Sequence, residues 1–399
     1  MQMDLFFKSS RRMMLFPKRS TEFVAVIAIV CTLFLFLHTQ SLTTRLREME
    51  NRLQPSALNS GNEYSGLAMT GESVGNNNNK FYPSNGNGNV ELENLYKYYK
   101  STGQMSTLNA LSLNNTRHSE NQIIFFNRVP KVGSQTFMEL LRRLSIRNNF
   151  RFHRDAIQRV ETIRLAPYQQ EELAEMVSEL STPSVYVKHV VYTNFTKFKL
   201  PTPIYVNLVR DPIERVISWF YYIRAPWYYV ERKQAFPDLP LPDSHWLRKD
   251  FETCVLRGDP ECTYTQGESH EGIGDHRRQT LFFCGHEDEC TPFNTKGALE
   301  KAKYNVETQY SVVGVLEDLN TTLAVLEKYV PRFFAGATEI YYNEIKNFNK
   351  INKNNFKPPV SEEVKNLLRQ NFSREIEFYK FCKQRLHRQF LAANLLDLK

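Results

Sequence analysis

The 399-residue sequence lacks the compositional extremes that mark non-globular chains. Glycine contributes only 16 residues, far below the roughly one-third that a collagen-like chain requires. Apolar side chains are not scarce, because 41% of the residues are hydrophobic and 13% are aromatic. These values exclude a coiled-coil rod and a wholly disordered chain, and no internal repeat is evident. The composition therefore predicts a globular protein with a sizeable hydrophobic core.

A strong basic excess is also missing from the body of the chain. The net charge is +8, but the first 21 residues alone carry +4. Nucleic-acid binding requires a local basic cluster on the folded surface rather than a mildly raised global charge. We therefore expect no nucleic-acid partner.

The longest apolar run covers residues 23–37 (FVAVIAIVCTLFLFL), and five basic residues precede it. A helix of this length, at about 1.5 Å per residue, is short for a bilayer but sufficient for a thin early-secretory membrane. No small-residue cleavage site follows, which favours a retained signal-anchor over a cleaved signal peptide or a buried core helix. Because a basic flank stays cytosolic, we predict a cytosolic tail over 1–22, a transmembrane signal-anchor over 23–38 and a lumenal remainder.

Residues 39–120 are rich in Asn, Ser and Gly, with NNNN at 76–79 and NGNGN at 85–89. Such a segment cannot bury enough apolar surface to fold by itself. We predict a largely disordered stem here, followed by a lumenal domain over residues 121–399.

From residue 121 onward, candidate strands alternate with candidate helices, which predicts an α/β fold with a parallel sheet flanked by helices. The expected strands are 123–126, 185–192, 204–209 and 310–319, and the expected helices are 136–145, 213–223, one through Val330 and a long C-terminal helix over 361–391.

The six cysteines fit an oxidising compartment. Cys254 and Cys262 stand eight residues apart, and Cys284 and Cys290 six apart, so two local disulfides are predicted. The alternative is a zinc site built from Cys284, His286, Cys290 and His276, although the spacing matches no common ligand pattern. A lumenal domain would also make glycosylation possible at four sequons, which are Asn114, Asn194, Asn320 and Asn371.

The segment NRVPKVGSQT (127–136) lies between an expected strand and an expected helix. It offers Gly133 for close backbone approach, the Ser134 and Thr136 hydroxyls, and the Lys131 and Arg128 charges, which together suit a phosphate. It is not a Walker A motif, because Lys131 precedes the glycine. An ordinary strand-to-helix turn with a solvated lysine is the alternative.

A second strand-turn-helix segment, VRDPIERVIS (209–218), places Arg210 at a strand end and Ser218 two turns into a helix. Both side chains can reach one oxyanion, unless Arg210 simply pairs with Asp211 or Glu214. Two such turns in one domain indicate a ligand with two separated phosphates.

Together, RVPKVGSQTF and VRDPIERVIS resemble the two nucleotide loops of carbohydrate sulfotransferases, and more narrowly of the uronyl and heparan sulfate 2-O-sulfotransferase family. The resemblance extends over about residues 121–385. Further motifs support it, and these are VYVKHVVYTNF (185–195), FFCGHEDEC (282–290), AKYNV (302–306), VVGVLEDL (312–319) and PRFFAGATEIY (331–341).

This resemblance implies a P-loop-like sulfotransferase fold and 3′-phosphoadenylyl sulfate (PAPS) as the sulfuryl donor. The residues implied for the 5′-phosphosulfate are Lys131, Val132, Gly133, Ser134 and Gln135. Those implied for the 3′-phosphate are Arg210 and Ser218, and later nucleotide contacts fall on Tyr341, Asn347, Asn352 and Asn355. The implied catalytic residues are His189, as general base, and Lys131. Val187 stands where the heparan enzyme has a second histidine.

The acceptor implied by the resemblance is an acidic glycan, and residues 142–164 are rich in arginine, the side chain best suited to carboxylates and sulfates. A solvated helix face is the alternative. The residues expected to face the acceptor are Arg128, Arg142, Arg147, Arg151 and His153.

We therefore expect a single-pass type II Golgi enzyme that transfers a sulfuryl group from PAPS to the 2-O position of a uronic acid in a glycosaminoglycan or related glycan. The scheme requires no metal, and the resemblance suggests a homotrimer. The alternative from another class is a non-catalytic, membrane-tethered binder of acidic glycans, with a nucleotide kinase third.

Overall fold

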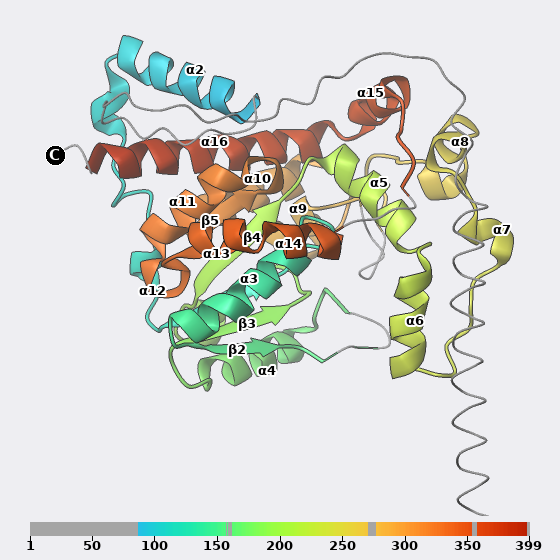
Figure 1. Ribbon diagram of the computed structural model, residues 1–399, viewed down its shortest axis with the longest axis horizontal. Helices are drawn as coiled ribbons and strands as arrows, with labels where there is room; N and C mark the ends of the chain where they lie inside the picture. Colours follow the sequence, from blue (N-terminus) through green and yellow to red (C-terminus); the bar gives the residue numbers. More distant parts are fainter. Residues whose placement is uncertain (1–86, 157, 159–161, 270–276, 353–356, 397–399) are drawn as a thin grey trace, which may run out of the picture. The chain divides into compact units, whose positions relative to one another are not determined.

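An all-parallel sheet of five strands, in the order β2-β3-β1-β4-β5, lies at the centre of the fold (Figure 1). The computed structural model describes residues 87–156, 158, 162–269, 277–352 and 357–396. The strands are β1 (Ile123–Asn127), β2 (Arg151–Arg154), β3 (Ser184–Lys188), β4 (Ile204–Val209) and β5 (Tyr310–Val315). The predicted parallel α/β architecture is confirmed.

Hydrophobic runs explain three of the strands, β1, β4 and β5. Every residue of β1, β4 and β5 is buried, as expected for parallel strands with both faces covered. β2 occupies one edge, and its exposed arginines hid it from sequence-based recognition.

The helices lie between and around these strands. The α-helices are α2 (Asn87–Ser101), α3 (Ser134–Arg147), α4 (Pro167–Ser178), α5 (Pro212–Tyr222), α6 (Pro226–Ala235), α7 (Ser244–Leu247), α8 (Phe251–Leu256), α9 (Thr280–Cys284), α10 (Lys296–Thr308), α11 (Leu319–Tyr329), α12 (Pro331–Phe334), α13 (Ala337–Asn343), α14 (Ile345–Asn352), α15 (Glu362–Asn371) and α16 (Ser373–Leu396). The short 3₁₀ helices are η1 (Gln104–Thr107), η2 (Asn115–His118), η3 (Phe195–Phe198), η4 (Pro260–Cys262), η5 (Asp288–Cys290) and η6 (Leu316–Asp318).

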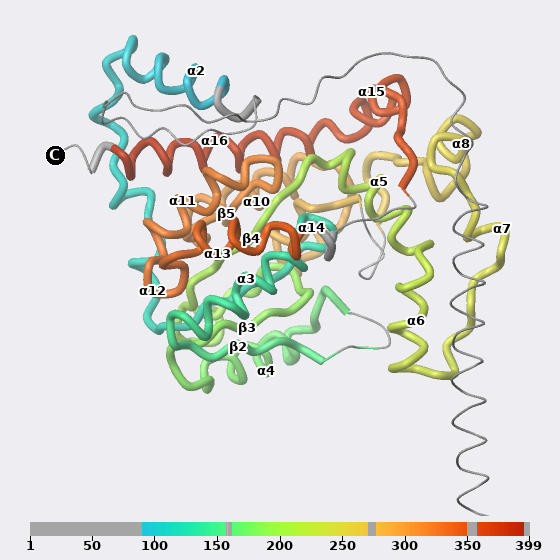
Figure 2. The backbone as a smooth tube through the Cα atoms, in the orientation of Figure 1, coloured from blue at the N-terminus to red at the C-terminus, as the bar shows by residue number. Residues whose placement is uncertain are grey.

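Two consecutive phenylalanines of β1 show that both faces of the sheet are covered. Phe126 packs against Phe137 of α3, with ring centroids 5.1 Å apart, whereas Phe125 packs against Phe195 of η3 at 5.4 Å. Neighbouring strand residues point to opposite faces, so α3 and η3 lie on different sides. The chain trace shows α10, α11 and the long α16 gathered around β5 (Figure 2).

Two predicted elements end earlier than expected. The strand predicted over 185–192 stops at Lys188, so His189 follows β3 instead of lying within it. The long C-terminal helix is interrupted at Phe372, which is fully buried between the rings of Tyr264 and Phe293, with both centroids 4.9 Å away. The need to bury this ring sets the break between α15 and α16.

Residues 87–120, predicted as the last part of a stem, are folded onto the domain. Leu92 of α2 is buried, and Glu91 pairs with Lys383 of α16 at 2.5 Å. Asn115 is also buried and donates to the carbonyls of Glu307 and Tyr310. The predicted tail (1–22), signal-anchor (23–38) and most of the stem lie outside the described residues. Among the helices of the described part, none is long and apolar enough to cross a membrane.

Both predicted disulfides are present, Cys254–Cys262 and Cys284–Cys290, and the remaining described cysteine, Cys382, is buried. The Cys284 and Cys290 thiols are therefore not available as zinc ligands. His286, between them, accepts a hydrogen bond from the Leu165 amide through Nδ1. His276 lies outside the described residues.

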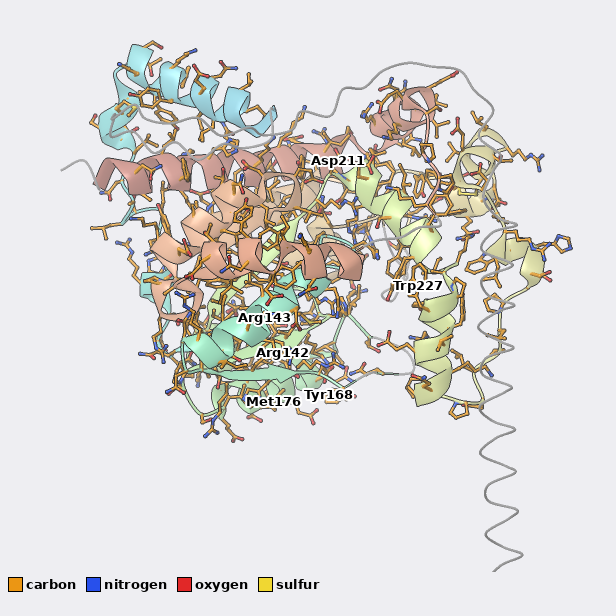
Figure 3. The ribbon with its side chains drawn as sticks, in the orientation of Figure 1. Arg142, Arg143, Tyr168, Met176, Asp211 and Trp227 are labelled. Carbon is orange, nitrogen blue, oxygen red and sulfur yellow. A yellow bond between two sulfur atoms is a disulfide. The ribbon has the colours of Figure 1, made fainter. Side chains whose placement is uncertain are left out.

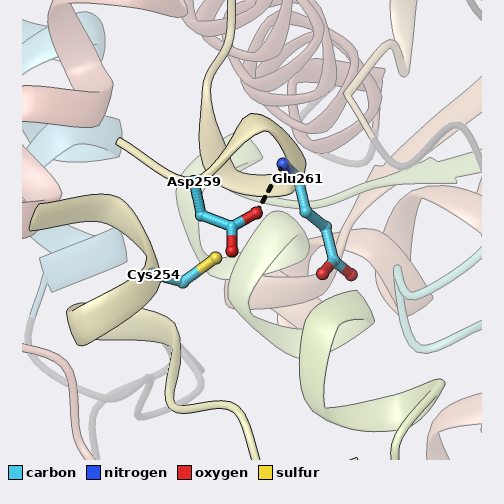
Figure 4. Close-up of side chains that lie close together, drawn as sticks. All are labelled: Cys254, Asp259 and Glu261. Carbon is cyan, nitrogen blue, oxygen red and sulfur yellow. Dashed lines mark hydrogen bonds between the residues drawn. The ribbon is translucent and has the colours of Figure 1, made fainter. Parts of the chain in front are cut away.

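Cys254 also lies close to two carboxylates, Asp259 and Glu261 (Figure 4). The Cys254 sulfur is in a disulfide, while Asp259 pairs with Lys249 at 2.6 Å and Glu261 with Arg224 at 2.7 Å. These contacts give the cluster a structural role in bracing the α8–η4 loop.

Candidate functional site

The turn from β1 into α3 has a backbone shape that requires glycine. Gly133 has φ 80°, and a Cβ at this position would lie 2.5 Å from Leu316 Cδ1. No side chain caps α3 at this residue. The first N–H groups of a helix have no acceptor within the helix itself, so an anion placed at the start of this 14-residue helix is favoured by both hydrogen bonding and the helix dipole.

Arg128 holds the first turn closed. Its Nε donates to Ser134 Oγ at 2.9 Å, and its Nη2 donates to Gln135 Oε1 at 3.0 Å. The guanidinium thus links the end of β1 to the first turn of α3 and adds a positive charge beside the open amides.

The second turn, between β4 and α5, is built on Asp211, which Figure 3 labels at the start of α5. One carboxylate oxygen of Asp211 accepts from the Ile213 and Glu214 amides at 2.9 and 3.0 Å, and Pro212 occupies the first helical position. Asp211 is therefore the N-cap of α5 and leaves Arg210 to other partners.

Arg210 reaches across to the first turn. Its Nη1 donates to the Lys131 carbonyl at 3.2 Å, while its charged partners, Glu214 and Glu317, both lie 3.8 Å away. Within the described residues, the buried Nε of Arg210 has no hydrogen-bond partner. Other buried guanidinium nitrogens of the described residues also lack such a partner, but the Nε of Arg210 lies beside the β1–α3 turn, where it could donate to an anion.

Further cations surround the same position. Burial lowers the pKa of Lys131 to about 7, and the charges of Arg210, Arg128 and Lys357 add to this effect. Lys357 itself pairs with Glu214 at 3.0 Å. Four positive groups thus lie close enough to repel one another, and an anionic ligand would relieve that repulsion.

One face of α5 connects the two turns. Glu214, Ser218 and Tyr222 follow at intervals of four residues and so share a face. The Lys131 ammonium lies 3.7 Å from the centre of the Tyr222 ring, and Glu214 lies beside Arg210. Ser218, half-buried, therefore lies on the face of α5 between Glu214 and Tyr222, next to the two turns predicted from the sequence to bind phosphates (the β1–α3 and β4–α5 turns, named here the two phosphate turns).

His189 lies directly beside the first turn. Its Nδ1 is 2.8 Å from the Arg128 carbonyl oxygen, which can only accept, so Nδ1 carries the proton and Nε2 carries the lone pair. Burial, helped by the Arg128 charge, lowers the pKa of His189 to about 3. The side chain is thus a neutral imidazole with one defined basic nitrogen.

A family model described as the sulfotransferase family matches residues 114–382. The chain belongs to the sulfotransferase family. The family indicated by the sequence motifs is confirmed.

The chain is also similar to individual named sulfotransferases. The chain is 38% identical to the uronyl 2-sulfotransferase homolog pip of Drosophila melanogaster, over 94% of this chain and 90% of that protein. It is 32% identical to heparan sulfate 2-O-sulfotransferase 1 of Xenopus laevis and 31% identical to the Homo sapiens protein of that name, in each case over 70% of this chain and 74% of the relative.

The residues predicted to make the later nucleotide contacts lie along α13 and α14 where the structure describes them. Tyr341 stacks on Phe348 with ring centroids 5.4 Å apart, and the exposed Asn347 donates to Glu344 at 2.6 Å. Asn352 ends α14, and Asn355 lies outside the described residues. The partners in these two contacts, Phe348 and Glu344, do not belong to the two phosphate turns.

The arginines predicted for the acceptor are spread over α3 and β2. Arg142, labelled in Figure 3, pairs with Glu139 at 2.9 Å, and Arg147 pairs with Glu339 at 2.7 Å. Arg151 is the first residue of β2 and so lies at the end of the sheet where the parallel strands begin. His153 pairs in register with Tyr186 of β3. Of the five predicted residues, the structure brings only Arg128 directly to His189.

The predicted sequons are distributed over the domain surface. Asn114 and Asn194 are N-caps of η2 and η3, and the side chain of each accepts from the amide two residues later. Asn320 lies in α11 and accepts from the Tyr342 hydroxyl, whereas Asn371 is exposed at the end of α15.

Several residues of the site were missed at the sequence level. Tyr222 could have been found, because it repeats the four-residue spacing of Glu214 and Ser218 on an aromatic-rich helix. Lys357 stands at the end of an Asn- and Lys-rich run that offers no local pattern. Its role is visible only through its contact with Glu214.

A pocket of about 990 Å³ lies beside α6, which carries Trp227 in Figure 3, and extends to α7 and to Pro358. Its lining is mostly apolar, and none of the residues assigned to the donor lines it among those that the structure describes. The pocket is therefore separate from the two phosphate turns.

Proposed function

We propose that this sulfotransferase moves a sulfuryl group from PAPS to the 2-O position of a uronic acid in a glycosaminoglycan or related glycan. The observation that carries the proposal is the direct contact between the base and the donor turn: His189 hydrogen-bonds the carbonyl of Arg128, whose guanidinium closes the first phosphate turn. The acceptor class follows from the similar proteins, which are a uronyl 2-sulfotransferase homolog and heparan sulfate 2-O-sulfotransferases.

The residues present fit a donor with two phosphates. Lys131, Val132, Gly133, Ser134 and Gln135 would hold the 5′-phosphosulfate with the open amides of α3, and Arg210 and Ser218 would hold the 3′-phosphate. Lys357 adds a charge to this site. When bound, PAPS supplies the sulfuryl group, which is joined to the 5′-phosphate by an anhydride bond. Tyr341, Asn347, Asn352 and Asn355 would extend the contacts along the nucleotide.

The chain's own residues then perform the proton and charge chemistry. His189 Nε2 accepts the proton of the acceptor hydroxyl, because Nδ1 is already committed to the Arg128 carbonyl. The Lys131 ammonium stabilises negative charge on the phosphate oxygen that departs. The two braced turns keep the donor fixed in front of the base, which supplies the orientation that transfer requires.

The acceptor would cross the basic surface of α3 and β2. Arg128 lies next to His189, whereas Arg142, Arg147, Arg151 and His153 lie farther along these elements and would contact neighbouring sugars of a polymer. The ion pairs of Arg142 and Arg147 with surface glutamates do not prevent this, since exposed pairs are weak and can be exchanged.

The setting we propose is a Golgi membrane, with a cytosolic tail over 1–22, an anchor over 23–38 and a lumenal catalytic domain. The two disulfides support an oxidising compartment. Glycans at Asn114, Asn194, Asn320 or Asn371 would follow from this topology, and a homotrimer is the expected assembly.

The test is transfer of labelled sulfate from PAPS to a panel of desulfated heparan, dermatan and chondroitin acceptors, followed by mapping of the sulfated position. His189→Ala should lose about 10²–10⁴ in turnover while keeping its affinity for adenosine 3′,5′-bisphosphate. His245→Ala, on the exposed surface of α7, is the matched control and should stay active. A non-catalytic glycan binder would bind the panel without any transfer, and that result would overturn the proposal.

A further inference from the structure

A buried glutamine lies directly behind the second phosphate turn. Gln279, 0% exposed, stands just before α9 and makes a two-way pair with the main chain of Arg210. Its Nε2 donates to the Arg210 carbonyl at 2.9 Å, and its Oε1 accepts from the Arg210 amide at 3.3 Å. One side chain, 69 residues away in sequence, thereby fixes the backbone on both sides of Arg210.

Gln279 is itself held by a buried carboxylate. Glu375, in the first turn of α16 and 0% exposed, accepts from the amides of Gln279 and Thr280 at 2.8 and 3.1 Å, and its other oxygen accepts from the Thr280 hydroxyl. A carboxylate this deeply buried needs such a complete set of donors. The start of α16 is therefore tied to the start of α9, and through Gln279 to Arg210.

Arg215 connects the same carboxylate to the first turn. Its side chain is 1% exposed, it acts on Glu375 as the nearby positive charge, and its Nε donates to the Pro130 carbonyl at 3.0 Å. Arg210 Nη1 bonds the next carbonyl, that of Lys131. A continuous set of buried contacts thus runs from α16 to both phosphate turns.

The position of Arg210 needs this support, because carboxylates stand on two sides of it. Glu214 and Glu317 are each 3.8 Å from the guanidinium, beyond hydrogen-bond length. A small shift of the backbone would let Arg210 close onto either one and form a charge-assisted pair. The guanidinium would then be less available to a ligand.

We propose that Gln279 and Glu375 are positioning residues for donor recognition, which hold Arg210 away from its neighbouring carboxylates and toward the 3′-phosphate of the nucleotide. The inference rests on the proposed function, in which Arg210 binds that phosphate. Neither residue touches the donor, and both act through the Arg210 backbone.

The experiment measures nucleotide affinity by calorimetry with two probes, adenosine 3′,5′-bisphosphate and adenosine 5′-monophosphate. The ratio of the two dissociation constants isolates the contribution of the 3′-phosphate. The full chain is compared with Arg210→Ala, with Gln279→Leu and with the double variant, and thermal unfolding is recorded for each. Gln389→Leu is the matched control, because Gln389 is also 0% exposed and its side-chain Nε2 donates to main-chain carbonyls, those of Leu113 and Ser311.

Gln279→Leu should weaken the preference for the bisphosphate by about two- to tenfold, the range of one hydrogen bond, with little change in monophosphate affinity. The loss should vanish in the Arg210→Ala background, because the glutamine acts through that arginine. Gln389→Leu should lower thermal stability without changing the ratio. A general structural effect would instead weaken both probes together.

A wild-type ratio in Gln279→Leu, alongside a reduced ratio in Arg210→Ala, would overturn the inference and leave the proposed function intact. A wild-type ratio in Arg210→Ala would overturn the assignment of the 3′-phosphate site itself. Should Gln279→Leu fail to fold, Glu375→Gln keeps the shape of the side chain and carries the same test, with the same reduced ratio expected.

Discussion

At the scale of single residues, His189 is oriented by a main-chain carbonyl and not by a carboxylate. A carbonyl fixes the tautomer without adding a negative charge, and the increase in the imidazole pKa from this hydrogen bond is outweighed by burial and by the positive charges of Arg128 and Lys188. The proposed base is therefore neutral and weak in the free protein, and a phosphosulfate placed beside it would raise its pKa toward a useful range.

This charge balance predicts a titration that depends on the nucleotide. His189 should stay neutral, protonated on Nδ1, between pH 5 and 8 in the free protein, because the pKa of about 3 lies below that window. Adenosine 3′,5′-bisphosphate should raise the pKa, since anions favour the imidazolium. Nitrogen-15 NMR of labelled histidine, assigned with His189→Ala, measures both states. A free-protein titration near pH 6.5 would contradict the buried, cation-flanked environment.

Lys131 predicts an uptake of protons on nucleotide binding. Burial lowers its pKa to about 7 in the free protein, so the side chain is mostly neutral at pH 8. A bound phosphate favours the ammonium, and the pKa should rise well above 8. Calorimetry at pH 8 in Hepes and in Tris should therefore show uptake of a large fraction of one proton. Lys131→Arg keeps the positive charge at all these pH values and should bind without uptake, whereas an unchanged uptake in this variant would assign the proton elsewhere.

At the scale of elements, hydrophobic runs predicted most strands of the sheet, whereas the charged residues of β2 prevented its recognition as a strand. β1, β4 and β5 are buried throughout, so their sequences were sufficient. β2 is an edge strand with exposed arginines, and the same arginines suggested a ligand surface instead of a strand. The helix predicted over 213–223 is present as α5, but the buried support of Arg210 comes from Gln279, which only the tertiary structure brings near.

The arginines of α3 give a prediction about acceptor length. At about 1.5 Å per residue, Arg147 lies some 20 Å along α3 from Ser134, so a short acceptor at His189 would not reach it. Charge reversal by Arg142→Glu and Arg147→Glu should reduce the transfer rate with long polymer acceptors, and it should also reduce the salt dependence of that rate. The rate with short oligosaccharides should change little. Steady-state kinetics with size-fractionated acceptors measure this. Weaker nucleotide binding in these variants would mean that the surface serves the donor.

At the scale of the whole molecule, the catalytic unit begins well before the residues that carry chemistry. Composition predicted a stem up to residue 120, because Asn and Ser are frequent there. The structure instead uses Asn115 as a buried hydrogen-bond donor, and Gln389 of α16 bonds the Leu113 carbonyl at 3.0 Å. Contacts over such sequence separations leave no local pattern.

These contacts predict where the chain can be shortened. Removal of residues 1–79 should leave the urea midpoint of the domain unchanged, since the described contacts of the N-terminal part with β5 and α16 are made within residues 87–120. Removal of residues 1–120 should lower it, because buried groups of α16 and β5 lose their partners, at about 1–3 kcal/mol for each. Equal midpoints for the two shortened chains would show that α2, η1 and η2 add nothing to stability.

The four cations around the two turns also bear on how the enzyme would be controlled. In the proposed function these cations face the 5′- and 3′-phosphates of PAPS, and both phosphates remain on the nucleotide after the sulfuryl group has left. A site that recognises the two phosphates common to the donor and the product nucleotide binds both molecules with similar affinity, so we expect strong product inhibition. Throughput in the compartment would then depend on how quickly adenosine 3′,5′-bisphosphate is removed, as well as on the supply of donor.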